Sequence, residues 1–197
     1  LTGYNRRFSP YIQRMQQLLA QRSSPFIFNY RMNAGFIPLD HWVHSIEGGG
    51  RNLGEACHIY DLFTALADAE VTGISAQAIK PGSGHYARND NFIATLSFAD
   101  GSLANLVYSA LGHDAIPKET AELYVDGKIA VLDDYKSLTV HGAKKQSLRT
   151  RVQDKGLMTE LERFSEGIQT GEWPIPWWQQ LQVSEVAFAV EEMVFER

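Results

Sequence analysis

The sequence predicts an α+β fold in which one mostly antiparallel, open sheet carries helices on one face. Segments with helical spacing lie near both ends of the chain, and strand-like segments joined by short turns lie in the middle. Strands joined by hairpins cannot form a doubly wound parallel sheet. No Gly-x-Gly-x-x-Gly stands between a strand and a helix. We therefore expect that this chain contains no Rossmann domain, the fold in which that glycine pattern binds a dinucleotide.

The N-terminal part is expected to hold a short strand at residues 3–5, a helix from Pro10 to about residue 22 and a strand at residues 26–33. Ser9 suits the N-cap of that helix, and proline suits its first position. Apolar side chains then follow at helical spacing. The segment 26–33 places aromatic and apolar side chains on one face and mostly polar ones on the other, which is typical of a half-buried strand.

Residues 34–50 contain a proline and three consecutive glycines, and we expect a long irregular loop there. Loops of this length in a compact domain are often functional. A helix is expected from about Asn52 to Ala67. Further strands are expected at residues 71–79, 92–98, 103–109, 121–125, 129–132 and 137–140, with hairpin turns at 99–102 and 126–128. Two helices, at about 157–170 and 177–196, complete the chain.

Length and charge place the chain among ordinary globular domains. Its 197 residues suit one domain, 1–197, and the net charge is −5. The basic residues Lys144, Lys145, Arg149 and Arg151 are interrupted by polar ones, and we interpret them as a solvated loop. We therefore expect no nucleic-acid partner.

The single cysteine, Cys57, excludes an intramolecular disulfide, and no apolar run approaches the length of a bilayer span. We expect a cytoplasmic protein with no membrane partner. The chain begins with Leu1 rather than methionine, and we expect it to be part of a longer protein.

The segment from Gly48 to Leu66 carries the most informative pattern. On a helix, Gly54, His58 and Asp61 fall on one stripe, and Glu55 lies within reach of the histidine. Histidine changes charge near neutral pH, and a nearby carboxylate favours its charged form. This pattern suits a general base, although a His-x-x-Asp pair on a helix is more often an ordinary surface or capping pair.

Other candidates lie in the segments around this helix. Arg31 and Asn33 share the polar face of the 26–33 strand, and His41 and Trp42 lie in the long loop, so we expect contacts with substrate. Two further interpretations stay open. His41 and His44 could bind a metal together with the histidine of the helix. Arg6 and Arg7 could bind an anion at a helix N-terminus, but are more simply a solvated strand end.

Several motifs together resemble one known family. The sequence is similar to the C-terminal domain of the glucose–fructose oxidoreductase / inositol dehydrogenase family, most closely to members found in polysaccharide biosynthesis. The similarity covers nearly the whole chain. The matching segments are residues 3–10, 29–35, 38–44, 48–61 and 98–102, and the helix containing Glu160 and Phe164.

The resemblance implies a two-domain oxidoreductase that moves hydride between NAD or NADP and a sugar, sugar acid or cyclitol. The cofactor would be bound mainly by a missing N-terminal Rossmann domain. The fold would be the dihydrodipicolinate-reductase-like C-terminal domain, whose open sheet face often makes a homo-oligomer. His58 matches the family's active-site histidine and Asp61 the acidic residue one turn later. Many members carry aspartate four residues before that histidine, where this chain has Gly54 followed by Glu55.

We therefore expect the substrate domain of an oxidoreductase that is inactive alone, because hydride donor and acceptor must share one site. His58 would act at the reacting hydroxyl, Asp61 and Glu55 would tune it, and Arg31, Asn33, His41 and Trp42 would bind the substrate. The alternative is a non-catalytic sugar-binding or dimerisation domain on the same scaffold. A metal-dependent hydrolase that uses His41, His44 and His58 is a third, weaker interpretation.

Overall fold

The computed structural model describes residues 2–143 and 147–196, so Lys144 and Lys145 of the basic segment lie outside the described residues. The helices are α1 (Pro10–Leu19), α2 (Cys57–Ala67), α3 (Leu157–Thr170) and α4 (Trp177–Glu196), with short 3-10 turns at Asn5–Phe8, Trp42–His44 and Arg88–Asp90 and a π-helical turn at Asn52–Ala56. The strands are β1 (Ile27–Asn33), β2 (Val71–Ala78), β3 (Asn91–Phe98), β4 (Leu103–Ser109), β5 (Glu119–Val125), β6 (Lys128–Asp133), β7 (Ser137–His141) and β8 (Leu148–Arg149).

All eight strands form one sheet in the order β2-β3-β4-β1-β5-β6-β7-β8. Strand β1 is parallel to β4 and antiparallel to β5, and the other neighbours are antiparallel. The expectation of an α+β fold with a mostly antiparallel, open sheet is confirmed. The expected strand at residues 3–5 is wrong, because the chain there enters the 3-10 turn Asn5–Phe8, and strand β8 was not expected.

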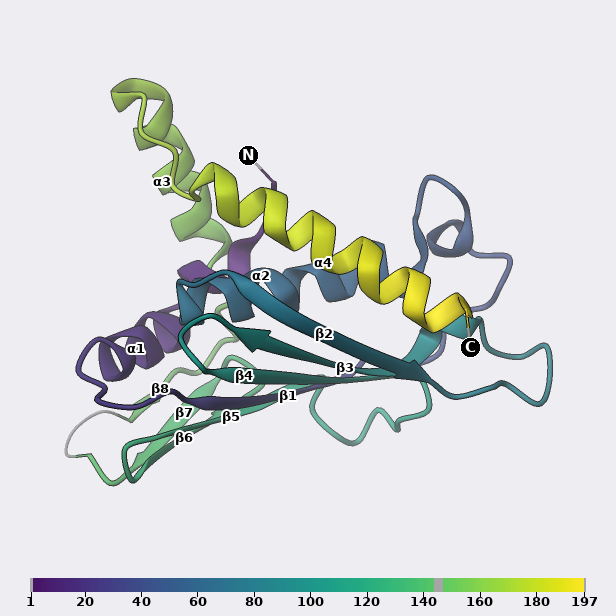
Figure 1. Ribbon diagram of the computed structural model, residues 1–197, viewed down its shortest axis with the longest axis horizontal. Coiled ribbons are helices and arrows are strands. Elements are labelled where there is room, and N and C mark those ends of the chain that lie inside the picture. Colours follow the sequence, from purple (N-terminus) through teal and green to yellow (C-terminus); the bar gives the residue numbers. More distant parts are fainter. Residues whose placement is uncertain (1, 144–146, 197) are drawn as a thin grey trace.

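The helices lie on one side of this sheet, and the other side is free of helices among the described residues (Figure 1). Helices α2 and α4 pack on each other and α4 lies over β2, whereas α3 projects away from the sheet (Figure 1). Alternating burial along β1 follows from this arrangement. Phe28, Tyr30 and Met32 face the helices and are buried, while Ile27 and Asn29 face the open side and are exposed.

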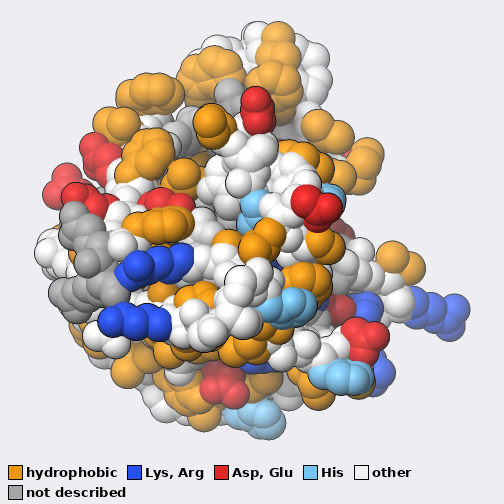
Figure 2. Space-filling model, turned by 90° about the vertical axis from the view of Figure 1, so that its right-hand side faces the viewer, with side chains coloured by type: hydrophobic (Ala, Val, Ile, Leu, Met, Phe, Trp, Pro, Cys, Tyr) orange, Lys and Arg blue, Asp and Glu red, His pale blue; other side chains and the backbone are white. Residues whose placement is uncertain are grey.

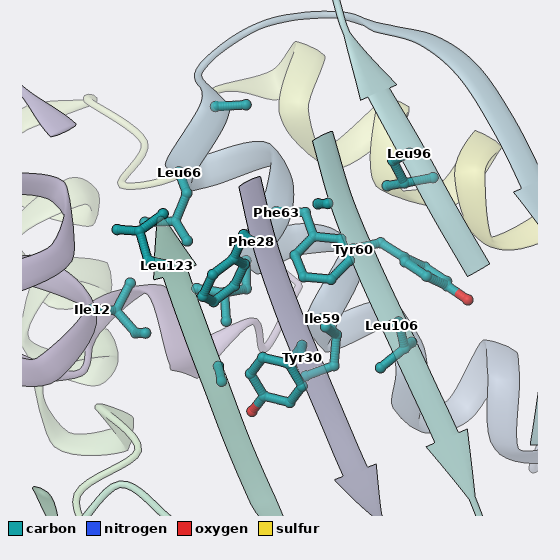
Figure 3. Close-up of a cluster of buried hydrophobic side chains, with 14 of the residues drawn as sticks. Ile12, Phe28, Tyr30, Ile59, Tyr60, Phe63, Leu66, Leu96, Leu106 and Leu123 are labelled. Atoms are coloured by element: carbon teal, nitrogen blue, oxygen red, sulfur yellow. The ribbon is translucent and has the colours of Figure 1, made fainter. Parts of the chain in front are cut away.

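Aromatic and aliphatic side chains from α2 meet those of the central strands in the core (Figure 3). Ile59, Tyr60 and Phe63 of α2 are fully buried, and the ring of Phe63 lies edge-on to Phe28, with centroids 5.6 Å apart. Burial of each such side chain contributes about 1.5–3 kcal/mol relative to its exposed state. The sheet therefore holds α2 firmly, so the residues at the start of this helix have a fixed position.

Large apolar side chains are exposed on α3, at the start of α4 and in the segment between them. Several large side chains there are exposed: Leu157, Met158, Leu161, Ile168, Trp173 and Trp177. At the end of the molecule shown in Figure 2, by contrast, hydrophobic, basic, acidic and histidine side chains are intermixed. Among the described residues, the helices are too short or too polar to cross a lipid bilayer.

Candidate functional site

A cavity of about 410 Å³ lies beside the first turns of the α2 segment. The loop 34–50, the turn before α1 and the segment that precedes β5 also contribute to its wall. We call it the His58 cavity. Its wall includes side chains that can bind a ligand or exchange a proton: Arg6, Trp42, Arg51, Glu55, His58 and Lys118.

Glycines allow the loop to pack closely against the start of the helix. A Cβ on Gly54 would lie 2.7 Å from the carbonyl oxygen of Gly48, and one on Gly48 would lie 2.3 Å from that of Trp42. Both contacts are with backbone, so larger residues would push the loop away. The turn Asn52–Ala56 is π-helical, a form often found at functional sites.

His58 is partly buried on the wall of the cavity and packs edge-on against Tyr4, with ring centroids 5.6 Å apart. Its Nδ1 atom is buried and has no hydrogen-bond partner among the described residues. Burial, followed by the charge of Arg6, lowers the pKa of His58 to about 4, against a weaker opposing effect of nearby carboxylates. The imidazole is therefore neutral at pH 7 and has a free lone pair to accept a proton.

Glu55 is the carboxylate that lines the cavity together with His58. Lys118 Nζ lies 2.7 Å from its Oε1 atom, Arg51 Nη1 lies 3.9 Å from Oε2, and the hydroxyl of Tyr108 donates to Oε2. Burial would raise the pKa of Glu55, but Lys118, Tyr108 and Arg51 outweigh it and hold the pKa below its ordinary value. Glu55 is therefore ionised, and it fixes Lys118 on the wall of the cavity.

Arg6 is anchored behind the cavity by a second carboxylate, Glu119. Its Nε atom donates to Glu119 Oε2 at 2.7 Å, and Lys155 Nζ lies 2.5 Å from Oε1. Burial alone would raise the pKa of Glu119, but these two cations lower it to about 2. Arg6 and Arg7 are only 6% and 7% exposed, so the expectation of a solvated strand end is wrong.

Asp61 is hydrogen-bonded to Arg7 and, among the described residues, not to His58, with which it was expected to pair. Its carboxylate is fully buried and accepts hydrogen bonds from Arg7, at 2.9 Å from Nε and 2.6 Å from Nη2, and Gln179 accepts from the same guanidinium at 2.6 Å. The expected pairing of His58 with Asp61 is corrected accordingly, because the arginine takes both carboxylate oxygens.

The expected substrate residues of β1 lie on the other side of the sheet. Arg31 donates to Thr120 Oγ1 at 3.1 Å, and the Asn33 amide donates to the carbonyl of His113 at 2.8 Å. Both side chains face the helix-free side, and neither lines the His58 cavity. The structure therefore does not bring Arg31 and Asn33 into one site with His58.

His41 and Trp42, the two loop residues expected to contact substrate, differ in whether they line the cavity. His41 is exposed, and its Nδ1 atom accepts from the backbone N–H of Val43 at 3.3 Å. Trp42 is 65% exposed and lines the His58 cavity. Of the residues expected at the site, the structure thus brings His58, Glu55 and Trp42 together.

Three cations at the cavity were not assigned to it from the sequence. Arg6 was noted beside a helix start, but its partner is more than a hundred residues away, and neither Arg51 nor Lys118 follows a recognisable motif. The alternative metal site is not supported either. Within residues 2–143 and 147–196, no group of three His, Cys, Asp or Glu side chains could hold a metal ion, so His41, His44 and His58 do not form one.

Comparison with protein-family models gave no match, and comparison with curated protein sequences gave none either. Several solved structures share the fold. UDP-N-acetylglucosamine 3-dehydrogenase GnnA from Acidithiobacillus ferrooxidans is 21% identical, with a TM-score of 0.76 over 97% of this chain and 60% of that one. Myo-inositol dehydrogenase from Corynebacterium glutamicum is also 21% identical, with a TM-score of 0.70 over 97% of this chain and 61% of that one.

A third match is an oxidoreductase from Agrobacterium radiobacter, solved in complex with NAD+, L-tartaric acid and magnesium. It is 14% identical, with a TM-score of 0.76 over 98% of this chain and 62% of that one. The chain thus spans about 60% of the length of the structures that it matches. At these identities the comparisons establish the fold. The resemblance noted in the sequence is therefore confirmed at the level of fold: this chain folds like the C-terminal part of glucose–fructose oxidoreductase / inositol dehydrogenase-type oxidoreductases.

Proposed function

We propose that this chain is the substrate-side domain of an NAD(P)-dependent oxidoreductase that acts on a hydroxyl or carbonyl carbon of a sugar, sugar acid or cyclitol. The observation that carries the proposal is His58, a neutral imidazole on the wall of a 410 Å³ cavity. Its place at the start of a firmly packed helix gives it the fixed position that proton transfer requires. The names of the structural relatives, which include a sugar-nucleotide and a cyclitol dehydrogenase, support the substrate class.

The cavity suits only the reacting end of such a complex. Its volume lies near the lower limit for small-molecule sites, which fits a monosaccharide-sized substrate and is too small for a whole dinucleotide. Trp42 and His58 would border the nicotinamide, and a domain outside this chain would bind the rest of the cofactor. The bound nicotinamide would accept or supply the hydride. That one relative was solved with NAD+ supports this division.

The residues of this chain would bind the substrate and move its proton. His58 would accept the proton of the reacting hydroxyl as the carbon is oxidised, and would return it in the reverse direction. Glu55 would hold Lys118 in place, and the exposed indole of Trp42 would cover a face of the sugar ring. Asp61 would act through the fold, by holding Arg7.

The helix-free face of the sheet would form a homo-oligomer. Exposed apolar side chains on this face support the proposal, among them Ile27, Ile93 and Leu103. Arg31 and Asn33 also lie on this face, so they would act at the interface rather than at the substrate.

The test is His58→Gln in the protein that carries this chain together with its cofactor domain. Oxidation of a panel of sugars, sugar acids and cyclitols is followed by NAD(P)H absorbance. Loss of a general base lowers kcat by about 10²–10⁴-fold, while KM changes little. His141→Gln, an exposed histidine on β7, is the matched control and should keep full activity. A His58→Gln enzyme that works at the full rate would sink the assignment.

One observation favours the alternative, a sugar-binding domain without catalysis. Position 54, where many family members carry aspartate, lies 2.7 Å from a backbone carbonyl at its Cβ, so an aspartate there would not fit this backbone. The usual carboxylate partner of the histidine is therefore missing. In this case both the unmodified protein and His58→Gln would bind the sugar, and neither would reduce the cofactor.

A further inference from the structure

The His58 cavity carries more positive than negative charge. Of the described side chains that line it, Arg6, Arg51 and Lys118 are cationic and Glu55 is the carboxylate, while His58 is neutral at pH 7. Such an excess of one sign in a confined space attracts a ligand of the opposite sign.

The carboxylates near the cavity do not cancel this charge. Glu55 lies between two cations, Lys118 at 2.7 Å and Arg51 at 3.9 Å, so one positive charge remains in this group. The other contacts of the Arg51 guanidinium do not reduce its charge. It donates to the carbonyl of Gly35 and lies over the ring of Tyr108, which are both uncharged.

The second group, around Glu119, also contains two cations and one carboxylate. Glu119 lies between Arg6 at 2.7 Å and Lys155 at 2.5 Å, and its other partner is the uncharged hydroxyl of Tyr30. One positive charge therefore remains here too. Together the two groups hold four cations and two carboxylates, at the wall of the cavity and directly behind it.

Lys118 is the cation that a ligand can reach most easily. Its side chain is 42% exposed, whereas those of Arg6 and Arg51 are 7% and 4% exposed. It lines both the His58 cavity and a neighbouring cavity of about 820 Å³ that is formed mainly by residues 33–36 and 112–118. The ammonium group has three donors, so at this junction Lys118 can keep its ion pair with Glu55 and also donate to a bound anion.

We infer that the substrate carries an acid group, a carboxylate or a phosphate, near the reacting hydroxyl, and that Lys118 binds it. The inference rests on the proposed function, which it narrows from sugars in general to anionic ones. A neutral sugar would leave the excess positive charge uncompensated when the closed site loses its water. An anion would replace that water with charge-assisted hydrogen bonds, which are about twice as strong as neutral ones.

Binding measurements test this without any turnover. Affinities of D-glucose, D-glucuronate and D-glucose 6-phosphate are measured by calorimetry on the protein that carries this chain, with acetate and inorganic phosphate as probes of the acid group alone. At least one sugar acid should bind tenfold or more tightly than glucose, and this preference should weaken as salt increases. Whichever acid is preferred identifies the group as carboxylate or phosphate.

Variants assign the effect to the lysine. Lys118→Gln should lower the affinity for the preferred acid about tenfold more than it lowers the affinity for glucose, and Lys118→Arg should keep the preference. Lys80→Gln, an exposed lysine after β2, is the control. Equal binding of glucose and both acids, an unaffected Lys118→Gln, or acetate or phosphate binding as tightly as the sugar acid would overturn the inference. Failure of the proposed function would appear separately, as full activity of His58→Gln.

Discussion

Replacement of Glu119 by glutamine tests whether the ion-pair cluster behind the cavity stabilises the protein. The carboxylate is fully buried, and Arg6 and Lys155 lower its pKa from 4.5 to about 2. At about 1.4 kcal/mol per pH unit, this difference corresponds to about 3 kcal/mol of stability. The group is ionised in both states above pH 4.5, so the full contribution is present there. It is lost as the pH falls from 4.5 to about 2, because the unfolded chain then binds the proton first.

Glu119→Gln should therefore lower the free energy of unfolding by about 3–5 kcal/mol at pH 7, since it leaves two cations beside a neutral amide. Urea denaturation of the 197-residue chain at pH 7, 5 and 3 measures this. The difference between variant and parent should shrink at pH 3, because there the unfolded parent binds a proton at Glu119 that the folded parent does not bind. Glu122→Gln, on the exposed face of the same strand, should cost under about 0.5 kcal/mol. A loss below about 1 kcal/mol at pH 7, or one that does not change with pH, would refute the reasoning.

Two further substitutions, at Asp61 and Gly54, test residues that we expect to stabilise the fold rather than to take part in proton transfer. Asp61→Asn should destabilise the chain by about 3 kcal/mol or more, because Arg7 loses its buried counter-charge, without changing the NMR titration of the cavity histidine. A large change in that titration would restore Asp61 to the site. Gly54→Ala should cost about 1–3 kcal/mol in thermal or urea unfolding, because its Cβ would lie 2.7 Å from the carbonyl of Gly48. Gly82→Ala, with open space around it, is the control, and equal costs at both positions would contradict the packing argument.

Local patterns in the sequence predicted most of the sheet and the two C-terminal helices. Alternation along the strands and the turn Asp126-Gly127, with φ of 47° and 72°, are properties of neighbouring residues, so they can be read without knowledge of the fold. The parallel pairing of β1 with β4 could not be predicted in this way. It joins Ile27 to Leu103, and nothing near either residue specifies the partner.

The candidate site was predicted only in part, for the same reason. His58, Glu55 and Trp42 were found because they lie in the segments 38–44 and 48–61, which resemble a known family. The helical stripe wrongly joined His58 to Asp61, because spacing alone cannot show that Arg7 competes for the carboxylate. Lys118 was missed because its contact with Glu55 exists only in the folded chain.

The central place of β1 also bears on the order in which this chain assembles. Strands β2 to β4 and β5 to β7 each form from consecutive hairpins, whose ends meet after a short search. Strand β1 is synthesised before both sets, yet Ile27 pairs with Leu103 on one side and Tyr124 on the other. We therefore expect β1 to stay unpaired until most of the sheet exists, and its docking to join the two meanders. We expect this late step to set the folding rate, since closure over long loops is slow.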